Sequence, residues 1–210
     1  MCIAVSSAFH AKMRDPTVVK LSIYYEAECP QSRDFFNKQL WPHWADLEDG
    51  VKLDLVPYGK ANHTEFDGQW LFQCDHGESE CLANKLHACV IKKLQSHTTK
   101  MIKCIKCLMT KKDQLASLPD CLNEIFLKAE ADKYWECLLS PETDELLVKY
   151  GDRTHKMFKN LDSTPKIVFN DTFRKRDQDA ALKEFRKPIC QYIPAVCEEK
   201  NIRQGLSLQL

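Results

Sequence analysis

The first clearly patterned region of the chain changes from the period of a strand to that of a helix. Residues 18–25 are rich in β-branched and aromatic side chains and partly alternate between apolar and polar positions. Apolar side chains then recur at helical spacing as far as Trp44. After a break at Asp49 and Gly50, a second alternating run covers residues 51–56. A strand, a helix and a strand of these lengths predict a βαβ unit with parallel strands.

Helical spacing dominates the middle of the chain. Residues 60–73 are mostly polar and predict a loop, with a short strand at residues 69–72. Apolar positions at helical spacing recur throughout residues 81–150. Within this stretch, Ser140 followed by Pro141 indicates a helix start, because serine caps a first turn and proline fits its first position. The pattern predicts a helical insertion packed against a βα core.

The last part of the chain returns to the sheet. Residues 165–169 predict a third strand, Asn170 and Asp171 predict a turn, and residues 179–185 predict a closing helix. Residues 198–210 have a mixed character and predict a frayed tail. Together the patterns predict one α/β domain that is closed by a ββα unit.

Charge narrows the choice of partners only slightly. The 210 residues carry 30 Lys plus Arg and 30 Asp plus Glu, so the net charge gives no indication of nucleic acid. Eight lysines and no acidic residue lie between Cys81 and Lys112. This run predicts either a solvated helical face or a surface for an anionic protein or cell-surface partner. No aromatic residues are interleaved with these lysines, which argues against single-stranded nucleic acid. The candidate anion-binding residues are Lys92, Lys93, Lys100, Lys103 and Lys106.

The cysteine content indicates an oxidising compartment. Eleven cysteines in 210 residues are rare in a cytosolic protein and typical of a secreted domain with several disulfides. No apolar run approaches the ~18–20 residues that a transmembrane helix needs. Residues 1–17 are interpreted as a signal-peptide remnant followed by an N-terminal arm. The Asn-x-Thr sequons at Asn62 and Asn170 are candidate glycosylation sites and agree with secretion.

The strand-to-helix junction carries the candidate nucleophile. Cys29 is followed by Pro30, Gln31 and Ser32, and it stands where the first strand ends and the first helix begins. Backbone N–H groups and the helix dipole at such a position favour a thiolate, which is the nucleophilic form. A redox enzyme of this type needs a second thiol three residues later, which attacks the mixed disulfide and releases the substrate. Ser32 occupies that position, and a hydroxyl cannot do this.

A cysteine-rich segment carries a family resemblance. Residues 74–89 read C-x-H-G-x-x-E-C-x-x-N-x-x-x-x-C, with seven fixed positions at fixed spacing. The segment resembles the signature of the GILT family, the gamma-interferon-inducible lysosomal thiol reductases. Pro57-Tyr58-Gly59, Leu118-Pro119-x-Cys121 and Gly151-Asp152-Arg153 agree with the same family. The chain is similar to the divergent secreted members found in insects, mosquitoes included.

The resemblance implies a thioredoxin-like fold with a disulfide-rich helical insertion. On this basis we expect a domain over residues 18–197, with the insertion at about residues 74–159. The family reduces disulfides at a C-x-x-C, often at acidic pH, and Ser32 replaces the second cysteine of that pair here. The resemblance also implies a cis peptide before Pro165, in a loop that faces the active thiol and can pair with an extended peptide.

The remaining cysteines are interpreted as structural. One hypothesis pairs Cys29 with Cys104, because Cys29 lacks its usual partner and Cys104 is extra relative to the family pattern. Cys104 and Cys107 also form a C-x-x-C, but they lie inside a predicted helix, so framework disulfides are favoured over a displaced redox pair. The candidates for structural disulfides are Cys74, Cys81, Cys89, Cys104, Cys107, Cys121, Cys137, Cys190 and Cys197.

Two functions from different classes follow. The first is a secreted GILT-like protein that has lost thiol-disulfide reductase activity and binds a protein or cell-surface partner. The second is a weak monothiol enzyme that uses Cys29 for disulfide exchange. Binding predicts that Cys29→Ser leaves the function intact, whereas catalysis predicts that it abolishes it. No cofactor is expected, and the spacing of the signature cysteines and histidines disfavours zinc. The family implies a lysosomal or endosomal location as the alternative to secretion.

Overall fold

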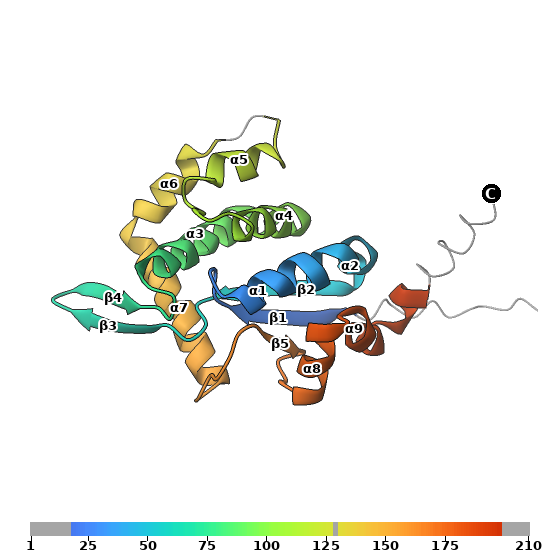
Figure 1. Ribbon diagram of the computed structural model, residues 1–210. Coiled ribbons are helices and arrows are strands. Elements are labelled where there is room, and N and C mark those ends of the chain that lie inside the picture. Colours follow the sequence, from blue (N-terminus) through green and yellow to red (C-terminus); the bar gives the residue numbers. More distant parts are fainter. Residues whose placement is uncertain (1–17, 128–129, 199–210) are drawn as a thin grey trace, which may run out of the picture.

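A three-stranded sheet in the order β2-β1-β5 forms the centre of the computed structural model (Figure 1). The structure describes residues 18–127 and 130–198; the predicted N-terminal arm with its signal-peptide remnant, and nearly all of the predicted tail, lie outside them. β1 (Val19–Tyr25) is central, parallel to β2 (Val51–Pro57) and antiparallel to β5 (Lys166–Phe169). The predicted parallel βαβ unit is therefore confirmed.

The helix between β1 and β2 is continuous, but its pitch widens once. It begins as α1 (Pro30–Asp34), passes through a π-helical turn, η1 (Phe35–Leu40), and continues as α2 (Trp41–Leu47) into a short 3-10 turn, η2 (Glu48–Gly50). In a regular α-helix, Pro42 would lack its hydrogen bond and its ring would clash with the carbonyl four residues earlier. The wide turn ends at Leu40, two residues before Pro42, and so covers the carbonyl with which the ring would clash.

Five helices follow in the predicted insertion. They are α3 (Glu78–Leu94), α4 (Thr98–Met109), α5 (Leu118–Asn123), α6 (Asp132–Leu139) and α7 (Pro141–Met157). The predicted start of the last helix is confirmed, because the Ser140 hydroxyl accepts a hydrogen bond from the backbone N–H of Glu142. In Figure 1, α4 and α5 lie above the α1–α2 helix, whereas α3 packs against β2.

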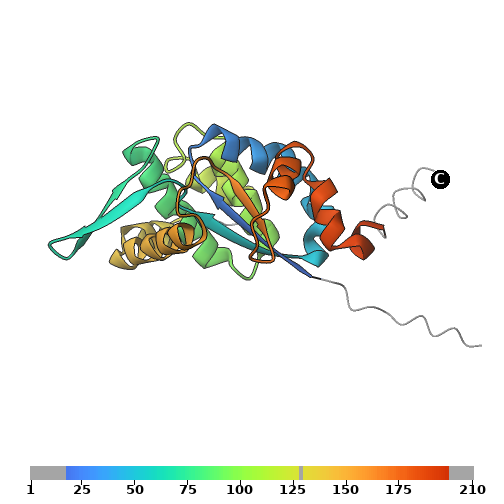
Figure 2. The ribbon, with the colours of Figure 1, turned by 90° about the horizontal axis from the view of Figure 1, so that it is seen from below.

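Residues 62–73 form a β-hairpin where a loop was predicted, and the second strand of the hairpin confirms the short strand predicted at residues 69–72. β3 (Asn62–Phe66) and β4 (Gln69–Gln73) are antiparallel, and the hairpin projects from the rest of the molecule (Figures 1 and 2). Asp67 and Gly68 join the strands with positive φ angles of 50° and 72°. An Asp-Gly pair is a preferred two-residue hairpin turn because both positions need positive φ. The hairpin could therefore have been predicted from this pair.

The end of the domain also differs from the prediction. Instead of a ββα unit, β5 is followed by two helices, α8 (Lys175–Lys183) and α9 (Arg186–Tyr192), and Thr172 makes only an isolated bridge. Asn170 and Asp171 both have positive φ, so the chain turns sharply after β5. Since α8 starts soon after this turn, too few residues remain for a further strand.

The sheet is buried on both faces, which explains why β1 is nearly all apolar. Leu21, Ile23 and Tyr25 of β1 belong to the main core, together with the helices on that side. Tyr24 faces a second core that contains Leu147 of α7. None of the helices in the described part of the chain is long and apolar enough to cross a membrane.

Candidate active site

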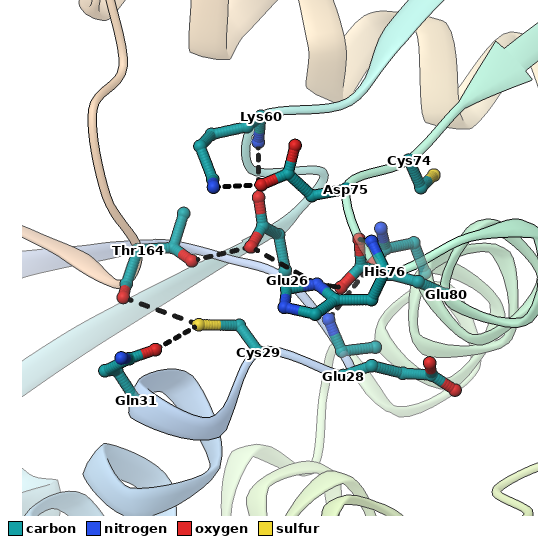
Figure 3. Close-up of polar contacts among 12 residues, drawn as sticks. Glu26, Glu28, Cys29, Gln31, Lys60, Cys74, Asp75, His76, Glu80 and Thr164 are labelled. Carbon is teal, nitrogen blue, oxygen red and sulfur yellow. Dashed lines mark hydrogen bonds and ion pairs between the residues drawn. The ribbon is translucent and has the colours of Figure 1, made fainter.

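Cys29 lies where β1 passes into α1, at the N-cap position of that helix. Pro30 follows at the first helical position, where the missing N–H costs no helical hydrogen bond. The Cys29 side chain is 4% exposed, and its Sγ lies 3.1 Å from Gln31 Oε1 and 3.6 Å from the carbonyl oxygen of Thr164 (Figure 3). The helix runs on through η1 and α2, so the positive end of its dipole is directed at the thiol.

Ser32 is buried on the first turn of the same helix. It is 0% exposed, and its hydroxyl oxygen has no hydrogen-bond partner among the described residues. The position that would hold a resolving thiol is therefore enclosed by protein and occupied by a group that cannot resolve a disulfide. In the part of the chain that the structure describes, the other free cysteine is Cys104, which is buried in the main core.

The loop before β5 completes the site. The Thr164–Pro165 peptide is cis, as the family resemblance implied, and the carbonyl of Thr164 faces the thiol. Gln178 of α8 holds this loop, because its amide nitrogen donates to the Pro165 carbonyl at 2.8 Å while its oxygen accepts from the Ile167 N–H at 2.7 Å. Cys29, Thr164, Pro165 and Gln178 line one pocket of about 300 Å³. The thiol therefore opens onto a hollow large enough for part of an extended peptide.

Glu26 and His76 also line this pocket, and the buried carboxylate of Glu80 lies next to His76 (Figure 3). Glu26, 0% exposed, accepts hydrogen bonds from the N–H of Lys60 at 2.7 Å and the hydroxyl of Thr164 at 2.9 Å. Glu80, also 0% exposed, accepts from the N–H and Nδ1 of His76 at 3.2 and 2.6 Å. His76 Nδ1 lies 3.9 Å from Glu26. Burial, and the nearby charge of Glu26, raise the pKa of Glu80.

Asn84 of the signature segment and Gln114, which follows α4, both bond to the backbone just before Cys29. Asn84 Oδ1 accepts from the Ala27 N–H at 2.9 Å, and Gln114 Nε2 donates to the Ala27 carbonyl at 2.9 Å. Gln114 Oε1 in turn accepts a hydrogen bond from His87 Nε2 at 2.8 Å. Because a neutral imidazole has one donor and one acceptor nitrogen, His87 Nδ1 accepts from the Tyr25 hydroxyl at 3.1 Å. Burial lowers the pKa of His87 to about 4, which keeps the ring neutral. The insertion therefore fixes the backbone that leads to the site.

Eight cysteines form framework disulfides. The pairs are Cys74–Cys81, Cys89–Cys137, Cys107–Cys121 and Cys190–Cys197. The prediction that Cys104 joins this framework is wrong, as is the hypothesis that it pairs with Cys29, because both thiols are free. Cys107, one turn later on α4, is the residue that reaches Cys121, whereas Cys104 points into the apolar core and is 0% exposed.

The remaining candidates lie away from the thiol. None of the five candidate lysines lines the Cys29 pocket, and four of them have intramolecular contacts. These are Lys92 with Glu142, Lys103 with the Glu124 carbonyl, Lys100 over the ring of Phe126, and Lys106 over the ring of Trp41. Both sequon asparagines, Asn62 and Asn170, are exposed.

Sequence reasoning did not find the buried charges of the site. Glu26 is a single acidic residue directly after an apolar strand, and Glu80 was seen only as one fixed position of the signature. Among the described residues, Glu26, His76 and Glu80 are also a set that could hold a metal ion, with ligand atoms within 4.8 Å of one another. Each of these atoms already has a hydrogen-bond partner in the protein.

Comparison with known proteins agrees with this architecture. The family model described as gamma interferon inducible lysosomal thiol reductase (GILT) matches residues 20–125. The chain is 32% identical to a gamma-interferon-inducible lysosomal thiol reductase-like protein of Anopheles gambiae, over 82% of this chain and 76% of the relative. It is 33% identical to GILT-like protein 1 of Drosophila melanogaster, over 87% of this chain and 80% of that protein.

Solved structures show the same fold at low sequence identity. The chain resembles DsbA of Chlamydia trachomatis with a TM-score of 0.57 at 15% identity, covering 97% of this chain and 95% of that one. It resembles BdbD of Bacillus subtilis with a TM-score of 0.53 at 19% identity, covering 81% of this chain and 90% of that one. The fold is thus that of thioredoxin-like oxidoreductases. Since the family model matches half of the chain and the two insect relatives cover more than four fifths of it, the chain belongs to the gamma interferon inducible lysosomal thiol reductase family.

Proposed function

We propose that this protein has lost the two-thiol reductase cycle of its family and acts by binding a protein partner in the pocket around Cys29 and Pro165. The observation that carries the proposal is the residue at position 32. Ser32 is fully buried where a resolving thiol is needed, and no other described free thiol lines the pocket. The rest of the site is intact, since Cys29 is free, stands at the N-cap position of its helix and faces the cis-Pro165 loop.

The missing thiol interrupts a defined step. The Cys29 thiolate attacks one sulfur of a partner disulfide, a bond forms between Cys29 Sγ and that sulfur, and the second partner sulfur leaves as a thiolate. With two thiols, the resolving thiolate then attacks Cys29 Sγ, forms an internal disulfide and releases the partner's sulfur. Ser32 cannot take that step, so a captured partner stays attached until an external thiol releases it.

The disulfides indicate the compartment in which the protein works. Four disulfides in the described residues fit an oxidising environment, so we infer a secreted protein, with the lysosome or endosome as the alternative. Exposure of Asn62 and Asn170 supports glycosylation at these sequons. The candidate lysines support an anionic partner only weakly, because most of them have contacts within the protein.

A second function is favoured by the position of Cys29 itself. A single free thiol at a helix N-terminus, opening onto a pocket, can exchange disulfides if a small external thiol performs the second step. In this alternative the external thiol attacks the mixed disulfide, bonds to the partner sulfur and leaves Cys29 reduced. The protein would then be a weak monothiol exchange enzyme.

Insulin-disulfide reduction with dithiothreitol, at about pH 4.5 and about pH 7, separates these functions. We expect the natural protein to match the control without protein and the Ser32→Cys variant to turn over. That result assigns the missing activity to one side chain of an intact scaffold. Turnover by the natural protein that disappears in Cys29→Ser would contradict the loss of activity and establish the monothiol enzyme. An inactive Ser32→Cys variant that folds normally would contradict the claim that the rest of the site is intact.

A further inference from the structure

A second hollow lies in the helical insertion, away from Cys29. It is lined by residues from the end of α3, the turn into α4, the stretch after α5 and the start of α6, and its volume is about 260 Å³. None of its residues lines the Cys29 pocket. A cavity of about 150 Å³ is enough to bind a benzene ring, so this hollow, called the insertion pocket below, has room for one ring and a further group.

Three apolar and aromatic side chains, Leu94, Phe126 and Tyr134, form the walls of the insertion pocket. Leu94 and Tyr134 belong to the main core, and Phe126 packs against it, so all three are held in place. Lys100 Nζ lies 4.5 Å from the centroid of the Phe126 ring and adds positive charge beside the pocket. Walls of this kind suit a flat apolar body such as an aromatic ring.

Tyr134 carries a polar group that lacks a partner. The residue is 6% exposed, yet its hydroxyl makes no hydrogen bond with any residue that the structure describes. It is not among the fully enclosed atoms without a partner, which belong to Ser32 and Asn84, so the hydroxyl keeps contact with the solvent of the pocket. Burial, with Cys104 nearby, raises the pKa of Tyr134 to about 12. The hydroxyl therefore keeps its proton and can donate to a ligand.

The charged side chains at the rim favour a ligand with a single negative charge. Lys93 lines the insertion pocket and has no ion pair, hydrogen bond or ring contact in the described part of the chain. Lys133 also lines it, but its charge is offset by an ion pair with Glu130, which is another lining residue. His97 completes the rim. One unpaired ammonium group can compensate one negative charge, and the Glu130 carboxylate would repel a second.

We propose that the insertion pocket binds an aromatic ring that carries one negative charge, as in an aryl sulfate or a sulfated tyrosine of a partner protein. The ring lies against Leu94 and Phe126. The sulfate accepts a hydrogen bond from the Tyr134 hydroxyl and pairs with Lys93. A sulfate monoester carries one charge, whereas an aryl phosphate carries nearly two at neutral pH. The site is separate from the Cys29 pocket and goes beyond the function proposed for it.

Titration calorimetry of the full chain with 4-methylphenyl sulfate, at about pH 7 and low ionic strength, tests the proposal. We expect saturable binding with a Kd of about 0.1 to 1 mM, as is usual for a good ligand of this size. 4-Methylphenol lacks the charge and inorganic sulfate lacks the ring, so each should bind at least about tenfold more weakly. 4-Methylphenyl phosphate should bind no more tightly than the sulfate, because its second charge meets Glu130.

Single substitutions separate the two polar contacts. Tyr134→Phe removes only the hydroxyl and should weaken binding about tenfold, while the midpoint of urea unfolding stays the same because this hydroxyl bonds to no described residue. Lys93→Gln should weaken binding about three- to tenfold and reduce its dependence on salt. Lys92→Gln is the matched control, since Lys92 is adjacent in the chain but is paired with Glu142 and does not line the pocket. Its Kd should equal that of the natural protein.

The proposal is overturned if 4-methylphenyl sulfate does not bind saturably, or if 4-methylphenol or inorganic sulfate binds as tightly. Equal weakening in Lys92→Gln and Lys93→Gln would also overturn it, because it would show that only the general charge of the insertion matters. If Tyr134→Phe does not fold, Lys93→Gln decides the question, since Lys93 is exposed.

A short peptide with one sulfated tyrosine, compared with its unsulfated form and with free 4-methylphenyl sulfate, identifies the source of the ligand. Tighter binding of the sulfated peptide supports a modified partner protein, and equal binding of the two sulfates supports a small molecule. Equal binding of the sulfated and unsulfated peptides contradicts the site. Since the two pockets share no residue, a failure here and a failed insulin assay are separate results.

Discussion

The βα core and the helical insertion each contain one free cysteine in the described part of the chain, and both side chains are buried. Cys29 is 4% exposed, stands at the N-cap position of the helix after β1 and faces the Thr164 carbonyl in a pocket. Cys104 is 0% exposed in the interior of α4, among the apolar side chains of the main core. Burial, together with nearby Glu124, raises the pKa of the Cys104 thiol to about 12.

The exposed fraction of the side chain does not distinguish the two cysteines. What differs is the surroundings of the sulfur. At a helix N-terminus, unpaired N–H groups and the helix dipole favour a thiolate, whereas apolar packing in the middle of a helix favours a thiol. The core region therefore carries the candidate reactive thiol, and the insertion contributes disulfides and the contacts that hold Ala27.

The largest expected effect is a difference in alkylation rate between the two thiols. A rise in thiol pKa from 9.0 to about 12 lowers the thiolate fraction of Cys104 about a thousandfold relative to an ordinary thiol. Burial slows its reaction further. Mass spectrometry of iodoacetamide-treated native protein should find Cys29 labelled and Cys104 unlabelled. Both should be labelled in guanidinium chloride, and equal labelling in the native state would remove the contrast.

The next effect concerns His87, where the two regions meet. Its pKa is about 4 in the folded protein and 6.5 for an ordinary histidine in an unfolded chain, so below pH 6.5 the unfolded state binds a proton that the folded state does not. Stability that is present above pH 6.5 is therefore lost as the pH falls toward 4, by about 3 kcal/mol for this residue. Urea unfolding between these pH values measures the loss.

The variant His87→Gln should lose less stability over the same pH range, because a neutral amide takes up no proton. His97→Gln is the matched control, since His97 is exposed on the same insertion. It should show the full loss of the natural protein. A loss that is the same in all three proteins would mean that His87 does not couple the stability of the two regions to pH.

The smallest expected effect is the change in stability when the buried thiol of Cys104 is removed. Cys104→Ala removes one buried sulfur, which is comparable to deleting a methyl group from a core, so we expect destabilisation of about 1 kcal/mol. The alkylation rate of Cys29 should not change. Cys29→Ala should show the reverse, with no alkylation at this site and little change in the midpoint of urea unfolding. A slower reaction at Cys29 in Cys104→Ala would show that the two thiols are coupled.

Much of the scaffold could be predicted from local patterns. The βαβ unit followed from two alternating runs around a helical one, and the helix start at Ser140 from a serine before a proline. The hairpin at Asp67-Gly68 was predictable by the same rules, although the polar character of its strands indicated a loop. The predicted ββα closing unit does not form, because a strand needs a neighbouring strand edge and enough residues to pair with it. Thr172 makes only a single bridge.

The sequence by itself determined the family and pointed to the candidate thiol and the serine in place of its partner, since these depend on residue types at short fixed spacing, as in Cys29 to Ser32. Only the tertiary structure decided which cysteines pair and which charges gather behind the thiol. Glu26 and Glu80 are 54 positions apart in the chain, yet both are buried at one end of the sheet beside His76. Such contacts depend on how segments far apart in the sequence pack in three dimensions. No local pattern in the sequence states which of these segments will meet.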